Sequence, residues 1–156
     1  MDLSELKNNY SEIEKKYKLP SFDRLNQDFE IDKIDKESEH LVRTVRKVVF
    51  EKIINSLNFL ELLQNPVNAP RTYLPYLRSM SVEDKKTIEE IYSSLGELSL
   101  AALELEIEFS DKREAELIKR AFDVWNSHKI RFKKIVAGIA KPINNNVARK
   151  EKSYFG

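Results

Sequence analysis

Two long stretches of this chain repeat apolar residues at heptad spacing, and this pattern constrains the fold more than any other feature. The first stripe consists of Ile88, Ile91, Leu95, Leu98, Ala102, Leu105 and Phe109. The second consists of Ile118, Ala121, Trp125, His128, Phe132, Ile135 and Ile139. Because residues spaced about 3.5 positions apart return to one face of an α-helix, we expect two long helices that pack at a shallow angle.

Capping residues indicate where these two helices begin. Ser81 is followed three positions later by Asp84, and Asp111 is followed at the same spacing by Glu114, so each pair predicts a capped helix start. The break between the two stripes is short, which predicts an antiparallel hairpin. Residues 103–109 also alternate like a β-strand, but the continuous heptad upstream favours a helix there.

Two further helices are expected nearer the N-terminus. Residues 3–17 carry apolar side chains on one helical side, and Pro20 should end that short helix. A longer helix should start near Asp32 or Asp35 and run to about Gln64, and its two apolar faces indicate a central position. The residues between these helices should form a packed, irregular connector.

The expected fold is an all-α helical bundle of three long helices plus a shorter N-terminal helix. Pro142 should end the last helix and leave a disordered, basic C-terminal tail. The single domain would then occupy residues 1–140 and the flexible tail residues 141–156. A length of 156 residues suits one domain, and a charged fraction of 34% fits long, solvated helices.

No complete catalytic or metal-binding set is recognisable in the sequence. The absence of cysteine excludes disulfides, thiolate nucleophiles and cysteine-based metal sites. Glu37 and His40 form one of the two Glu-x-x-His pairs that a di-iron bundle needs, but the other histidine, His128, lacks its glutamate. Antiparallel pairing would place His128 opposite residues 93–95, where a serine either satisfies its ring or forms a Ser–His nucleophile pair. We expect no enzyme activity, no cofactor and no metal.

Charge is divided unevenly along the chain, although the net charge is only +1. Residues 83–117 carry 11 acidic against 4 basic side chains, which gives −7, and residues 128–156 carry 8 basic against one acidic, which gives +7. Either these segments pack beside each other, or the basic one binds an acidic partner such as nucleic acid. The basic side chains that would contact nucleic acid are Lys129, Arg131, Lys133, Lys134, Lys141, Arg149, Lys150 and Lys152.

A proline-rich segment, residues 65–80, interrupts the helices and mixes aromatic with cationic side chains. Tyrosine and arginine dominate interface hot spots, so this loop is a candidate contact surface; alternatively its aromatic residues plug the open end of the bundle. The candidate partner-binding residues are Arg71, Tyr73, Tyr76 and Arg78 in the loop, with Tyr154 and Phe155 in the tail. Gly96 and Ser99 permit either close helix packing within the monomer or a dimer seam.

These observations favour a non-catalytic protein–protein interaction or assembly module, a small helical adaptor or subunit. Its partner would be another protein or a second copy of the chain, as in a homodimer. The alternative is a nucleic-acid-binding accessory protein that uses residues 129–152. Since no apolar run is long enough for a signal peptide or a bilayer span, we expect a soluble, cytoplasmic protein without a membrane partner.

Overall fold

The computed structural model describes the backbone of residues 1–35 and 37–154 and the side chains of residues 1–35 and 37–141. Within these ranges the regular structure is entirely helical, with three short 3-10 turns between the helices. The α-helices are α1 (Leu3–Tyr17), α2 (Phe22–Phe29), α3 (Leu41–Gln64), α4 (Leu74–Ser79), α5 (Val82–Ile107) and α6 (Asp111–Tyr154). The predicted all-α bundle is confirmed, with the two short helices α2 and α4 added to it.

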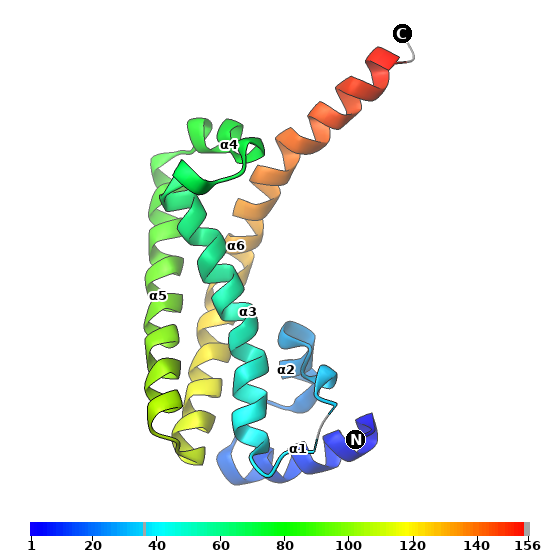
Figure 1. Ribbon diagram of the computed structural model, residues 1–156, viewed down its shortest axis with the longest axis vertical. Helices are drawn as coiled ribbons and strands as arrows, with labels where there is room; N and C mark the ends of the chain where they lie inside the picture. Colours follow the sequence, from blue (N-terminus) through cyan, green and yellow to red (C-terminus); the bar gives the residue numbers. More distant parts are fainter. Residues whose placement is uncertain (36, 155–156) are drawn as a thin grey trace.

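The helices α3, α5 and α6 run side by side and form the body of the bundle (Figure 1). α1 and α2 pack at the end where α3 begins, and α4 lies across the opposite end. The first heptad stripe is buried from Ile88 to Leu105, whereas Phe109 lies beyond the end of α5 and is 39% exposed. In the second stripe only His128 and Phe132 are half-buried, and the other members are buried. The period of the sequence therefore identifies the core faces of α5 and α6.

Two helix starts differ from the prediction. α3 begins at Leu41 rather than near Asp32 or Asp35, because Ile31 and Ile34 are buried around a 3-10 turn that follows α2. This burial outweighs the local helix signal. At the start of α6 the capping residue is Ser110 rather than Asp111, since the Ser110 carbonyl accepts a hydrogen bond from the backbone amide four residues later.

Pro142 lies inside α6 instead of ending it, because the helical backbone continues to Tyr154. A proline inside a helix removes the hydrogen bond that its missing N–H would make, here to the carbonyl of Gly138, and its ring clashes with that carbonyl. These two effects kink a helix or end it, and here the helix continues. The sequence also predicts that residues 141–156 are flexible. Apart from Lys141, the side chains of these residues lie outside the described ones, so their flexibility stays a prediction. Along the parts of the chain with assigned backbone, no helix has the length and hydropathy to cross a membrane.

A buried ion cluster joins the three long helices near the α5–α6 turn. Arg46 of α3 is 4% exposed and donates from Nε to Oε2 of Glu114 in α6, at 2.6 Å. The same guanidinium donates from Nη2 to Glu106 of α5 at 2.5 Å, and Arg43 binds the other Glu106 oxygen at 3.0 Å. Glu114, interpreted from the sequence as a capping partner, is fully buried.

The stability of this cluster depends on each buried charge having an oppositely charged partner. Burial lowers the pKa of the Arg46 guanidinium, but the hydrogen bonds to Glu114 and Glu106 outweigh burial, and the net shift of the pKa is upward. The hydrogen bonds from Arg46 and Arg43 lower the pKa of Glu106. Removing one partner therefore leaves a buried charge without compensation, which costs more than removing the pair together.

We predict that Glu114→Leu lowers the free energy of unfolding by about 3 kcal/mol, because the buried Nε of Arg46 then loses its acceptor and the guanidinium keeps only the partly exposed Glu106. The double variant Arg46→Met with Glu114→Leu should recover most of this loss, since no buried charge remains. Urea unfolding followed by circular dichroism measures both variants. A double variant as unstable as the single one would contradict the ion-pair explanation.

Candidate interaction surface

The proline-rich loop packs its aromatic residues inward and leaves its cations in solvent. Tyr76 of α4 is 8% exposed and lies against α6, where a Cβ added to Gly138 would approach the Tyr76 ring to 2.9 Å. The half-buried Tyr73 contacts Phe59 of α3 edge to face, with ring centroids 6.0 Å apart. These positions favour the plug over the interface for both tyrosines. Arg71 and Arg78 are exposed and are not brought together with them into one site.

The two helical glycines provide a direct test of this plug. Gly138→Ala should lower the free energy of unfolding by about 1 kcal/mol or more, because the added methyl group displaces the Tyr76 ring. Gly96→Ala is the matched control: nothing lies within 4 Å of its added Cβ, so alanine should stabilise α5 by about 0.5–1 kcal/mol. Thermal and urea unfolding measure both. Equal effects of the two substitutions would contradict a tightly packed plug.

The basic side chains of α6 are divided between internal ion pairs and solvent. Lys129 binds the Asp28 carboxylate of α2 at 3.2 Å, and Arg131 binds Glu90 of α5 at 2.9 Å. The exposed members of the group within the described side chains are Lys133, Lys134 and Lys141. Side chains of Arg149, Lys150, Lys152 and Tyr154 lie outside the described residues, as does Phe155. Two of the predicted nucleic-acid contacts are therefore engaged within the chain.

His128 lies opposite Ser94, as the hairpin register predicted, and the hydrogen bonds around it fix its tautomer. Its Nε2 lies 3.2 Å from Ser94 Oγ, and Nη2 of Arg131 lies 2.8 Å from its Nδ1. Since a guanidinium can only donate, Nδ1 accepts and Nε2 carries the ring proton. The ring therefore donates to Ser94, whose hydroxyl donates to the carbonyl of Glu90 at 2.9 Å. This arrangement satisfies the histidine and does not activate the serine.

Burial lowers the pKa of the His128 imidazole from its ordinary value of 6.5, and the Arg131 charge lowers it further, while Glu90 opposes both. We predict that Arg131→Ala raises this pKa, since one lowering cause is lost and Glu90 is freed. Because a depressed histidine pKa costs stability as the pH falls below 6.5, the variant should also show a shallower loss of stability there. An NMR titration of the ring measures the pKa, with Arg120→Ala as an exposed control; an unchanged or lower value in Arg131→Ala would contradict the assignment.

The Glu-x-x-His pair does not form half of a metal site. Glu37 precedes α3 and His40 is its N-cap residue, so the two do not share a helix face as the sequence spacing suggested. The His40 ring packs edge to face on Phe109, with centroids 4.8 Å apart. Among the residues with described side chains, no group of three or more metal-ligating residues comes together.

The most prominent surface feature is an apolar stripe on the solvent side of α5. Leu100 is 68% exposed, Leu103 58% and Ile107 83%. With Gly96 they follow spacings of four, three and four residues, which places them on one helix face. Figure 1 shows α5 at the edge of the bundle, with α3 and α6 on its inner side. We call Gly96, Leu100, Leu103 and Ile107 the outer face of α5.

A groove continues this face toward the α4 end of the bundle. It has a volume of about 870 Å³ and lies between the end of α3, α4 and the first half of α5. Its apolar walls include Leu63, Leu77 and Met80, and Tyr92 lies on the α5 side, one turn before Gly96. The Tyr92 hydroxyl donates a hydrogen bond to the Glu61 carboxylate, which raises the pKa of this tyrosine. The groove and the outer face together follow most of the length of α5.

The outer face of α5 was not identified from the sequence, although a signal for it is present. Residues 103–109 alternate apolar and acidic side chains. In a helix, positions two apart differ by about 200° around the axis, so such alternation distributes apolar residues over two opposite faces. Leu105 is buried on one face, whereas Leu103 and Ile107 are exposed on the other. The strand-like pattern therefore marked a helix with two apolar sides.

Comparisons with known proteins add no family to this geometry: no protein-family model, no curated protein and no solved structure matches the chain.

Proposed function

We propose that this chain is a non-catalytic protein–protein interaction or assembly module that binds its partner through the outer face of α5. The observation that carries the proposal is the row formed by Leu100, Leu103 and Ile107, three large apolar side chains that are more than half exposed on one helix face. Complete burial of such a side chain contributes about 1.5–3 kcal/mol. Three of them supply enough to offset part of the entropic cost of association.

The groove beside Tyr92 supports the same surface. Interfaces are centred on apolar anchors that enter pockets, with a charged rim around them. Here the groove offers the concave site, and the outer face of α5 extends it as a ridge. Arg78, on the same short helix as the groove-lining Leu77, is exposed and remains a candidate rim contact; Arg71 is exposed as well.

Nucleic-acid binding through residues 129–152 receives less support as an alternative. Lys129 and Arg131 are held by Asp28 and Glu90 of the same chain, so they do not offer free cations to phosphates. The cytoplasmic location stays a prediction from the sequence.

The proposal predicts that Leu103→Gln with Ile107→Gln lowers partner capture about tenfold or more, because the partner loses two apolar anchors. The free energy of unfolding should change by no more than about 0.5 kcal/mol, since both side chains lie in solvent in the free protein. Affinity capture with the tagged full chain, quantified by mass spectrometry, measures the first effect and urea unfolding the second.

Val67→Gln is the matched control, because Val67 is 94% exposed and lies in the loop after α3 rather than on α5. It should leave partner capture unchanged. Capture that is equal in wild type, control and double variant would contradict a role for the outer face of α5.

A further inference from the structure

The outer face of α5 is bordered by carboxylates. Glu97 and Glu104 lie along one flank, Glu108 follows the last residue of the helix, and the basic residues of α5 are limited to Lys85 and Lys86 at its opposite end. Glu104 binds Arg113 at 3.2 Å while its side chain stays 70% exposed, so most of its charge faces solvent. Two such faces brought together would oppose like charges, whereas a basic helix would match both the apolar stripe and its flank.

A segment of this composition is present in the chain itself. Residues 141–156 carry four basic side chains against Glu151, a net charge of +3. Three of their apolar residues, Ile143, Val147 and Tyr154, follow at spacings of four and seven, which are helical spacings. The backbone from residue 142 to Tyr154 is helical. This part of α6 therefore has the charge, the sequence period and the backbone conformation expected of a helix that binds the outer face of α5.

The same segment is out of reach of the α5 in its own chain. The ion pairs Glu104–Arg113 and Glu90–Arg131 set the register of the hairpin and place the first residue of α5 level with about residue 139 of α6. Beyond that level α6 continues away from the body of the bundle (Figure 1). A helix that continues in this direction can reach an outer face of α5 only on another molecule.

The two elements also agree in length. From Gly96 to Ile107 the outer face spans about 17 Å at 1.5 Å per residue, and residues 141–154 span about 20 Å as a helix. We propose that the outer face of α5 binds the C-terminal segment 141–154 of a second copy of this chain. This inference rests on the proposed function and names its partner. Two copies that exchange their segments reciprocally would form a closed, two-fold dimer.

The test uses the full-length chain and two complementary variants. The segment variant carries Arg149→Glu, Lys150→Glu and Lys152→Glu and keeps its α5 intact; the face variant carries Leu103→Gln and Ile107→Gln and keeps its segment intact. Lys15→Glu, Lys16→Glu and Lys47→Glu together form the control, with the same charge change at exposed positions elsewhere. Sedimentation equilibrium over a range of concentrations and salt measures self-association.

Wild type and control should dimerise, more weakly as salt rises, and each variant alone should dimerise about tenfold or more weakly. A mixture of the two variants, followed by fluorescence energy transfer between labelled copies, should recover association, because each supplies what the other lacks. This recovery distinguishes the proposed contact from one between two α5 faces or two segments, neither of which a mixture would restore.

A wild-type chain that stays monomeric at all concentrations, or a mixture that recovers nothing, would overturn the inference. The proposed function is judged separately, by the capture experiment with the face variant. Loss of capture together with a monomeric wild type would retain the interaction surface and reject the second copy as its occupant. Unchanged capture would reject the surface itself.

Discussion

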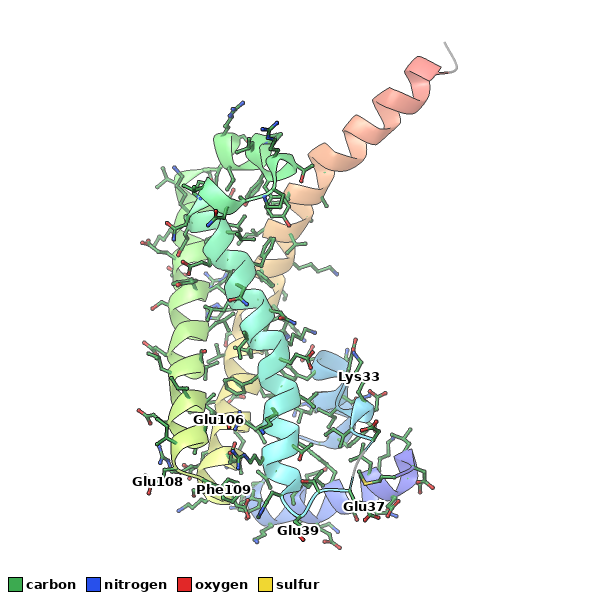
Figure 2. The ribbon with its side chains drawn as sticks, viewed as in Figure 1. Lys33, Glu37, Glu39, Glu106, Glu108 and Phe109 are labelled. Carbon is green, nitrogen blue, oxygen red and sulfur yellow. The ribbon has the colours of Figure 1, made fainter. Side chains whose placement is uncertain are left out.

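The buried contact between Arg46 and Glu114 is the interaction on which the arrangement of the long helices depends. Figure 2 shows its level in the bundle through the labelled Glu106 and Phe109, beside the turn between α5 and α6. A heptad stripe by itself specifies which face is buried but tolerates a shift by one repeat, because Leu and Ile recur along it. A buried carboxylate tolerates no such shift, since any other register leaves two charges unpaired in the core. The cluster therefore sets the level at which α3, α5 and α6 meet.

Fixing that register determines the surface as well as the core. α5 has apolar residues on two sides, and only one side can face α3 and α6. At the far end Tyr76 closes the bundle against Gly138, so the loop after α3 contributes packing rather than an exposed aromatic patch. What remains in solvent is the second apolar side of α5. The candidate interaction surface is thus the part of the helical sequence that the three-helix core has no place for.

The sequence predicted those features that depend on local period and missed those that depend on distant partners. The core stripes of α5 and α6, the cap at Ser81 and the position of His128 opposite Ser94 follow from spacing within one hairpin. Glu114 was misinterpreted because its partner Arg46 lies 68 residues away, and no local pattern distinguishes an inward carboxylate from a cap. The start of α3 was misplaced for a similar reason, since tertiary burial holds Ile31 in a turn.

The charge division of the chain shows how far internal packing can match opposite charges. Arg131 lies beside Glu90, so part of the acidic α5 does offset part of the basic α6, while Lys129 pairs with α2 instead. The match is incomplete because the two helices differ in length: α5 has 26 residues and α6 has 44. Glu97 of α5 and Glu108, which follows its last residue, lie level with residues 111–127 of α6, where four acidic and four basic side chains balance. The basic excess is concentrated farther along α6, beyond the reach of these carboxylates. In an antiparallel hairpin whose helices differ in length, the end of the longer helix has no partner helix beside it. The acidic excess of α5 and the basic excess of α6 are therefore separated, and each can attract the opposite charge on a second molecule.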